Sequence, residues 1–165
     1  MTTEIKANLT REDYASFNTH LFIKKNLKKY IALSIGISLA LPFFFTSKST
    51  PELFDFILSF IVYNLFFWLL MYNRLRKTKN IPMEGGPTLG ERKYILSDSE
   101  FICENELVSS KIKWDGIKSV DITKKAIYLF VDTNQAYIVP KRTFPDQLSE
   151  NEFMELINQK IKKIK

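Results

Sequence analysis

Two long apolar runs dominate the pattern of hydrophobic and polar residues along the chain. The first covers residues 30–45 without a charged residue, and the second covers residues 53–72 with Asp55 as its only charge. An α-helix rises about 1.5 Å per residue and the hydrocarbon core of a bilayer is about 30 Å thick, so about 20 residues cross it. Both runs are apolar on all sides, which is typical of a helix surrounded by lipid. The pattern predicts transmembrane helices over residues 30–46 and 53–72, with a kink at Pro42 whose freed carbonyl a neighbour must satisfy.

A short polar segment, residues 46–52, separates the two runs and predicts the tight turn of a helical hairpin. The alternative is a hairpin buried in a soluble domain, but 165 residues are too few to cover two such helices. The turn holds only Lys48 as a base. Many bases instead flank the runs on the sides away from the turn: Lys24, Lys25, Lys28, Lys29, Arg74, Arg76, Lys77 and Lys79. Because cytoplasmic flanks are rich in Lys and Arg, we expect both termini in the cytoplasm.

The segment before the hairpin, residues 1–29, predicts a cytoplasmic strand and an amphipathic helix. Residues 4–9 are long enough for one short strand. Thr10 is a good N-cap residue, and Asp13 three residues later forms an approximate capping box with it. The helix that follows is expected to lead toward the membrane.

The chain changes in character after the hairpin. A basic flank and a linker rich in Pro and Gly cover residues 73–90. The remainder, residues 91–165, contains short strand-like segments separated by turn residues: 92–96, 100–103, 107–114, 117–122, 126–131 and 136–139. A helix then follows from an N-cap at Ser149, with Phe153 at the start of its apolar face. This order predicts an α+β membrane protein, in which a small antiparallel, pleckstrin-homology-like β domain is closed by a C-terminal helix.

Four motifs in this region resemble the YcxB-like family of bacterial membrane proteins: GERKYILS (90–97), IKWDGIKSV (112–120), IYLFV (127–131) and YIVPKRTF (137–144). The order of parts over nearly the whole chain is also similar to that family. The resemblance implies two membrane helices, a C-terminal domain similar to bacterial pleckstrin-homology domains, and a multi-pass location in the bacterial cytoplasmic (inner) membrane. It brings no catalytic residues and no cofactor.

The residues themselves also give no sign of catalysis. No phosphate-binding glycine loop, nucleophile elbow or zinc-binding helix motif is present, and the chain has one histidine and one cysteine. Cys103 has the surroundings expected of a buried strand cysteine. We therefore expect a non-enzymatic protein with no catalytic, cofactor-binding or metal-binding residues. The formal charge of +6 is explained largely by the helix flanks, so no nucleic-acid partner is expected.

The remaining bases are candidate contacts with membrane lipids or with an unknown protein partner: Lys111, Lys113, Lys118, Lys141 and Arg142. Pro140 cannot donate to a β-ladder, so the last strand is expected to end there. Asp55 and Asn64 are candidate contacts within the membrane. Two functions stay open: a cytosolic domain that binds a protein partner or inner-leaflet lipid, and an immunity protein whose hairpin neutralises a membrane-acting toxin. The partner could also be another copy of the chain.

Overall fold

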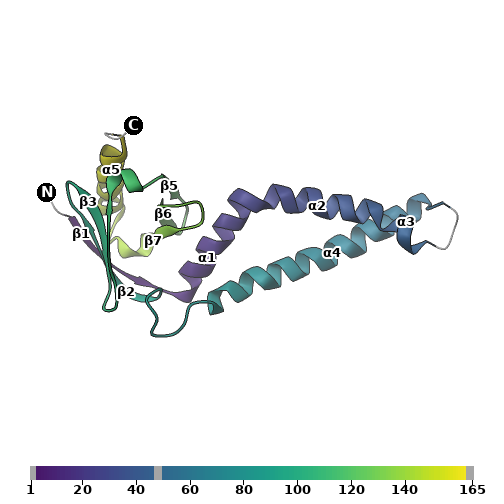
Figure 1. Cartoon of the computed structure of the whole chain (residues 1–165), viewed down its shortest axis with the longest axis horizontal. Helices are drawn as coiled ribbons and strands as arrows, with labels where there is room; N and C mark the ends of the chain where they lie inside the picture. Colours follow the sequence, from purple (N-terminus) through teal and green to yellow (C-terminus); the bar gives the residue numbers. More distant parts are fainter. Residues whose placement is uncertain (1–2, 47–49, 163–165) are drawn as a thin grey trace. The chain divides into compact units, whose positions relative to one another are not determined.

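The structure is a computed structural model that describes residues 3–46 and 50–162 (Figure 1). It combines helices with antiparallel sheet, as the sequence predicts. Contacts divide the chain into two compact units. We call residues 1–17 with 80–165 the β unit and residues 18–79 the helical hairpin. Lys48, the base expected in the turn, lies outside the described residues.

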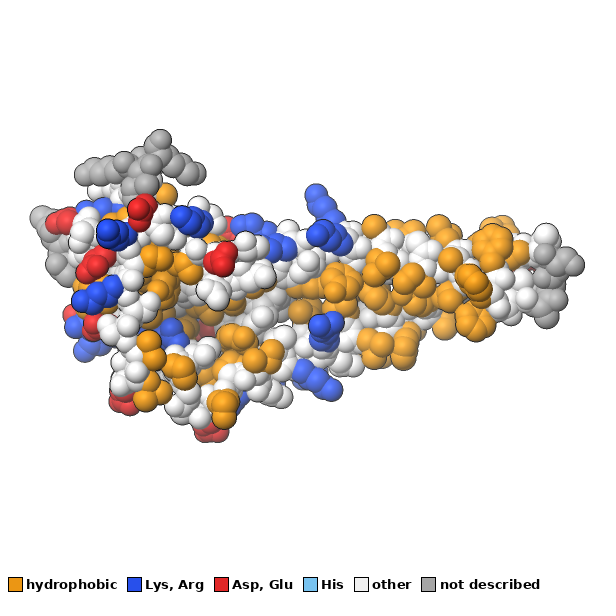
Figure 2. All heavy atoms as spheres, in the orientation of Figure 1, with side chains coloured by type: hydrophobic (Ala, Val, Ile, Leu, Met, Phe, Trp, Pro, Cys, Tyr) orange, Lys and Arg blue, Asp and Glu red, His pale blue; other side chains and the backbone are white. Residues whose placement is uncertain are grey.

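The helical hairpin contains the two apolar helices predicted from the sequence. Its described helical segments are α1 (Arg11–Leu21, which starts in the β unit), a π-helical turn (Phe22–Asn26), α2 (Leu27–Ala40), α3 (Pro42–Phe45), α4 (Leu53–Lys77) and a 3₁₀ turn (Thr78–Asn80). Two continuous stretches, Arg11–Phe45 and Leu53–Asn80, are long and apolar enough to cross a membrane. Along α4 only Met71 is buried, so large apolar side chains cover the outer surface of the hairpin (Figure 2).

Pro42 divides the first apolar helix, as expected, and the structure identifies the neighbour that compensates. Proline has no N–H, so the carbonyl of Ser38, four residues earlier, loses its usual partner within the helix. The Ser59 hydroxyl of α4 donates to this carbonyl oxygen at 3.0 Å. Ser38 is fully buried where α2 packs on α4. The bond therefore joins the two helices at the point where the proline interrupts one of them.

We expect Ser59→Ala to lower the free energy of unfolding of the hairpin by about 1 kcal/mol, because it leaves the Ser38 carbonyl without a donor. Thermal unfolding of the full chain in detergent micelles, followed by the helical circular dichroism signal, would measure the change. Ser34→Ala is the matched control, since the Ser34 hydroxyl donates only to Ile31 in its own helix. Equal melting temperatures for the two variants would contradict this role of Ser59.

The β unit contains two antiparallel sheets. The four-stranded sheet has the order β1-β2-β3-β4, and the three-stranded sheet has the order β5-β6-β7. The strands are β1 (Thr3–Leu9), β2 (Gly90–Leu96), β3 (Glu100–Glu104), β4 (Ser109–Lys113), β5 (Ser119–Ile122), β6 (Ala126–Phe130) and β7 (Ala136–Pro140). Short 3₁₀ turns follow β4 (Trp114–Gly116) and β7 (Lys141–Thr143), and α5 (Gln147–Lys162) ends the unit.

The N-terminal strand is part of the same sheet as the C-terminal strands. β1 pairs with β2 over its whole length, from Thr3 opposite Leu96 to Leu9 opposite Gly90 (Figure 1). The hairpin is thus inserted between two neighbouring strands of one sheet. Sequence periodicity carries no information on such a distant pairing, and it places β1 in a separate segment. The segment boundaries 1–29, 30–72, 73–90 and 91–165 stay predictions.

The core of the β unit lies between the sheets and α5. All five residues of β6 are buried. Tyr94, Phe101 and Phe153 are almost completely buried, and the rings of Tyr94 and Phe101 stack at 5.7 Å. The helix begins at Gln147, two residues before the expected cap at Ser149. The expected cap is wrong, because the Asp146 carboxylate accepts a hydrogen bond from the Ser149 N–H at 2.8 Å and fills that role.

Candidate functional site

The motif that begins in β7 ends the strand where the sequence predicts. Pro140 is the last residue of β7, opposite Ala126 of β6. The Lys141 N–H still donates to the carbonyl of Lys125 at 2.9 Å, and the chain then forms the 3₁₀ turn Lys141–Thr143. This turn presents the two candidate bases, Lys141 and Arg142, to residues of other elements of the β unit.

Arg142 forms a two-point ion pair with Asp13, at the start of α1. Its Nη1 and Nη2 donate to Asp13 Oδ1 and Oδ2 at 2.6 and 2.5 Å, and Nη2 also donates to the Asn8 carbonyl at 2.7 Å. The Asp13 side chain is buried, whereas that of Arg142 is half-exposed. One residue thus fastens the end of β1 and the start of α1 to the end of β7.

Thr10 completes the surroundings of the Asp13 carboxylate. The Thr10 backbone N–H and hydroxyl donate to Oδ2 at 2.8 and 2.9 Å, and the Asp13 N–H donates to the Thr10 hydroxyl, so the expected capping box is present. Burial acts to raise the pKa of the Asp13 carboxyl. The hydrogen bonds from Arg142 and Thr10 together outweigh burial, so this pKa lies below its ordinary value. Asp13 is therefore held as a carboxylate.

Lys141 also has a partner inside the β unit. Its Nζ lies 2.6 Å from Glu150 Oε1 on α5, and the side chains of both residues are largely buried. Two of the five candidate bases, Lys141 and Arg142, therefore join the end of β7 to α5 and α1. This engagement favours a structural role for both, and a lipid or partner contact by either one stays a prediction.

The other candidate bases lie on or just after β4. Lys111 and Lys113 are exposed and alternate along the strand, opposite Ile102 and Glu100 of β3. Lys118 is exposed, and its Nζ donates to the Asp115 carbonyl at 3.1 Å. The structure places the first two on one face of the four-stranded sheet, at its β4 edge.

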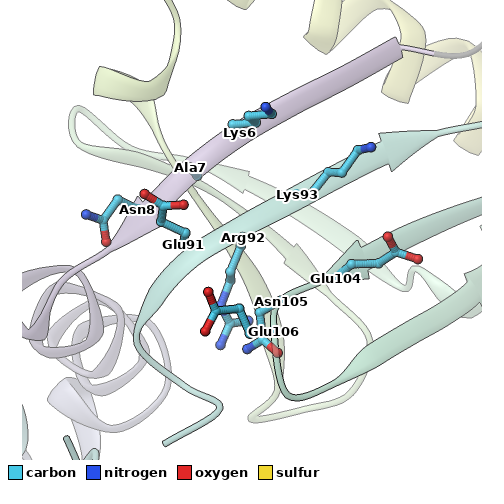
Figure 3. Close-up of a pocket in the computed structure, with 9 residues that line it drawn as sticks. All are labelled: Lys6, Ala7, Asn8, Glu91, Arg92, Lys93, Glu104, Asn105 and Glu106. Atoms are coloured by element: carbon cyan, nitrogen blue, oxygen red, sulfur yellow. The ribbon is translucent and has the colours of Figure 1, made fainter. Parts of the chain in front are cut away.

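Acidic residues interleave with the bases on this sheet. A hollow of about 380 Å³ is lined by three bases, three acids and three uncharged residues (Figure 3): Lys6, Arg92, Lys93, Glu91, Glu104, Glu106, Ala7, Asn8 and Asn105. Lys93 also forms an ion pair with Glu4 at 2.7 Å. Equal numbers of acids and bases give this surface no net charge, so it has little general attraction for an anionic lipid headgroup.

Asp55 and Asn64 each have a partner within their own helix. The Asp55 carboxylate accepts a hydrogen bond from the Glu52 N–H at 2.9 Å, and the Glu52 side chain completes a capping box at the start of α4. The Asn64 side-chain amide donates to the Phe60 carbonyl at 2.9 Å. Asp55 also lines a largely apolar hollow between α3 and α4, next to Pro42. A contact within the membrane by either residue stays a prediction.

The potentially reactive residues of the β unit have structural surroundings. Cys103 is a buried free thiol in β3, and burial raises its pKa, which disfavours the reactive thiolate. Trp114 is buried and donates its Nε1–H to the Ser97 carbonyl at 3.1 Å. Within residues 3–46 and 50–162, no group of three or more His, Cys, Asp and Glu residues is arranged to hold a metal ion.

Sequence reasoning missed the partners of the candidate bases. Asp13 was recognised as part of a helix cap, but the ion pair joins it to a residue 129 positions away. Glu150 was also not identified as a partner of Lys141, because only the packing of α5 in the fold brings the two residues together. The ring of Phe17 on α1 lies 5.3 Å from that of Tyr128 on β6, a contact that the expected amphipathic helix did not indicate. An apolar or charged position in the sequence does not by itself identify its partner on another element.

Comparison with known proteins gives a family match for part of the chain. Residues 96–157 match the family described as YcxB-like protein. No curated protein and no solved structure matched the chain. The matched residues extend from the end of β2 to the buried core residue Ile157 of α5, and they include three of the four motifs in full. Residues 96–157 are therefore similar to the YcxB-like family, which supports the resemblance seen in the sequence motifs.

Proposed function

We propose that the chain is a non-enzymatic integral membrane protein of the bacterial cytoplasmic membrane. Its hairpin crosses the bilayer twice, and its β unit is a pleckstrin-homology-like module in the cytoplasm that binds a protein partner or inner-leaflet lipid. The observation that carries the proposal is the pair of apolar helices, whose large side chains face outward. Such a surface is stable in lipid and costly in water.

The pairing of β1 with β2 supports a chain that crosses the membrane twice. The strands flank the hairpin in sequence and pair in one sheet, so the chain must enter and leave the membrane on the same side. Two helices satisfy this condition and one does not. The bases that flank the hairpin, among them Lys24 and Arg74, indicate that this side is the cytoplasm.

The arrangement of the β unit supports the pleckstrin-homology-like assignment. One four-stranded and one three-stranded antiparallel sheet enclose a common core, and a C-terminal helix packs on it. The first strand of this arrangement is β1, which the chain forms before the membrane helices. In such a protein the hairpin is an insertion in the module, which then cannot move far from the membrane surface.

The contacts of the five candidate bases indicate which of them are available to bind a partner or a lipid. Lys141 and Arg142 hold elements of the β unit together, whereas Lys111, Lys113 and Lys118 extend toward solvent. The latter three are the bases with which the unit would attract an acidic partner or an anionic headgroup. With acids on the same sheet, we propose that this attraction is weak and diffuse.

Two experiments test the proposal: alkaline extraction of membranes that contain the chain, and mapping of its topology with a reporter enzyme. We expect the full chain to stay in the membrane fraction after alkaline carbonate washing. We also expect alkaline phosphatase to be inactive when fused after Lys165 and active when inserted in the turn beside Thr50. Release of the chain by carbonate would contradict the membrane assignment, and active phosphatase after Lys165 would contradict the orientation.

A further inference from the structure

Four large apolar side chains of the β unit are exposed, two in the segment after α4 and two in the turn between β3 and β4. They are Ile81, Met83, Leu107 and Val108, with exposed fractions of 62, 80, 62 and 49%. Among the described residues of the β unit, only Ile122 and Leu148 are other large hydrophobic side chains with comparable exposure. Figure 2 shows hydrophobic side chains on the surface where Figure 1 places the chain between α4 and β2. We call these four residues the apolar tip.

Hydrogen bonds hold the two parts of the apolar tip in place. Asn105 connects them, because its side-chain amide donates to the Pro87 carbonyl at 2.9 Å. Its Oδ1 accepts hydrogen bonds from the backbone N–H groups of Leu107 and Val108 at 3.0 and 2.6 Å. Leu107 also lines one hollow together with Gly86 of the linker. The turn between β3 and β4 therefore presents Leu107 and Val108 in a defined conformation, fastened to the segment after α4.

The linker is bonded at a second point as well. Arg11 Nη1 donates to the Pro82 carbonyl at 2.9 Å, and Arg92 Nη2 donates to the Pro87 carbonyl at 2.5 Å. Pro82 lies between Ile81 and Met83, so both exposed residues belong to a segment that the β unit holds at Pro82 and again at Pro87. This exposure is a feature of the folded unit.

Chain connectivity confines the apolar tip to the end of α4. The 3₁₀ turn after α4 ends at Asn80, so Ile81 is the next residue and Met83 is the third. Consecutive Cα atoms are at most about 3.8 Å apart, which keeps Met83 within about 11 Å of Asn80. The last turn of α4 carries Arg74, Arg76 and Lys77, as expected at a membrane surface. Asn80 lies eight residues after the apolar run ends at residue 72, a helical rise of about 12 Å, and the headgroup region extends about 5–8 Å beyond the hydrocarbon core. A reach of about 11 Å from Asn80 is therefore long enough to return Met83 to the headgroup region.

The charges around the apolar tip argue against an anionic headgroup as the ligand. Three acids, Glu84, Glu91 and Glu106, and one base, Arg11, line the hollow that contains Leu107, so acids outnumber bases there. Carboxylates are repelled by a negative leaflet, but interfacial apolar side chains are stabilised by burial whatever the headgroup. The surface therefore fits the interface of a bilayer through apolar burial.

We infer that the apolar tip inserts into the headgroup region of the bilayer that α4 crosses, and that this contact fixes the β unit against the membrane. The inference rests on the proposed function, because it requires α4 to span the membrane. It goes beyond that function by placing the contact at Ile81, Met83, Leu107 and Val108 and away from the bases. It also predicts that the contact does not need anionic lipid.

Site-specific fluorescence in vesicles tests this inference. The full chain, with Cys103→Ala, receives a single cysteine at residue 83, 107, 99 or 65, labelled with an environment-sensitive fluorophore. Ser99 is the matched control, because it is exposed in the turn at the opposite end of β3 from Leu107. Leu65, in α4, reports on membrane insertion. Each protein is reconstituted in phosphatidylcholine vesicles with and without a lipid that carries a shallow quencher, after its circular dichroism spectrum has been matched to wild type.

We expect labels at residues 83 and 107 to emit at shorter wavelength than the label at 99 and to lose more emission to the shallow quencher. If labels 83 and 107 behave like label 99 while label 65 is shielded from water, the apolar tip does not insert, and the proposed function stands. If label 65 is also exposed to water, both are overturned. Insertion that appears only after phosphatidylglycerol is added would overturn the apolar mechanism.

Discussion

Replacement of Phe153 by alanine is expected to lower the free energy of unfolding of the β unit by about 3–5 kcal/mol. Phe153 is 1% exposed and is the largest side chain that α5 places in the core. Its ring lies 5.2 Å from that of Phe144, at the end of the family motif that begins in β7. Alanine would leave a cavity between α5 and the sheets, because the surrounding strands cannot collapse to fill it.

Urea unfolding of the full chain in detergent measures this effect. Trp114 is buried in the same core, and its fluorescence follows the β unit in a Trp68→Phe background that silences the hairpin tryptophan. Leu148→Ala is the matched control on the same helix, since Leu148 is 67% exposed and should change the stability by less than about 0.5 kcal/mol. A Phe153 variant as stable as the Leu148 variant would show that α5 is not part of the core.

The sequence predicted best those elements whose signal is local. The apolar runs gave the hairpin helices, because hydrophobicity on all sides of a helix does not depend on distant residues. The end of β7 at Pro140 follows from the missing N–H of proline. The capping box of Thr10 and Asp13 was expected from residues three positions apart. In each case the physical cause lies within one or two turns of chain.

Local sequence patterns predicted strand bounds less well where a side chain, in place of a neighbouring strand, accepts the backbone hydrogen bonds. The strand predicted over residues 107–114 is shorter in the structure, where β4 covers Ser109–Lys113. Asn105 accepts the N–H groups of Leu107 and Val108 in a tight turn, which removes both from the ladder. Their apolar character favoured a strand, but these side chains are exposed. This difference is what gives the β unit its apolar tip.

Distant pairings could not be derived from the sequence at all. β1 pairs with a strand that begins 81 residues after β1 ends, across the whole hairpin (90 − 9 = 81). Ser59 was not singled out, although a partner for the carbonyl freed by Pro42 was expected. Arg142 was singled out as a candidate contact with lipid or a partner, and Asp13, with which it pairs, was assigned to a separate segment. A single sequence does not indicate which distant residues contact one another in the fold.

Arg142→Ala is expected to lower the free energy of unfolding of the β unit by about 2–3 kcal/mol at neutral pH. The substitution removes both hydrogen bonds to Asp13 and the one to the Asn8 carbonyl, and it leaves a buried carboxylate without its counter-ion. The half-exposed position of Arg142 keeps the effect below that of a fully buried pair. Urea unfolding monitored by Trp114 fluorescence would measure it.

Variants of both partners separate the ion pair from other contacts of Arg142. Arg142→Lys keeps the charge but cannot make the two-point contact, so we expect it to recover only part of the lost stability. In an Asp13→Asn background no carboxylate is left unpaired, so Arg142→Ala should then cost clearly less than in wild type. Equal costs in both backgrounds would mean that the ion pair does not contribute, and that Arg142 acts only through the Asn8 carbonyl.

The pH dependence of the same substitution tests the state of Asp13. The folded pKa of Asp13 lies below its unfolded value of about 3.9, so the stability from the ion pair is complete above that value and is lost as the pH falls through the folded pKa. The difference in unfolding free energy between wild type and Arg142→Ala should therefore be constant between pH 6 and 8 and shrink below about pH 4. In the variant, no guanidinium opposes the effect of burial on Asp13, so the pKa of this carboxyl is higher than in wild type. The free energy of unfolding of the variant therefore falls less than that of wild type as the pH is lowered. A difference that stays constant down to pH 3 would mean that Arg142 does not stabilise the Asp13 carboxylate.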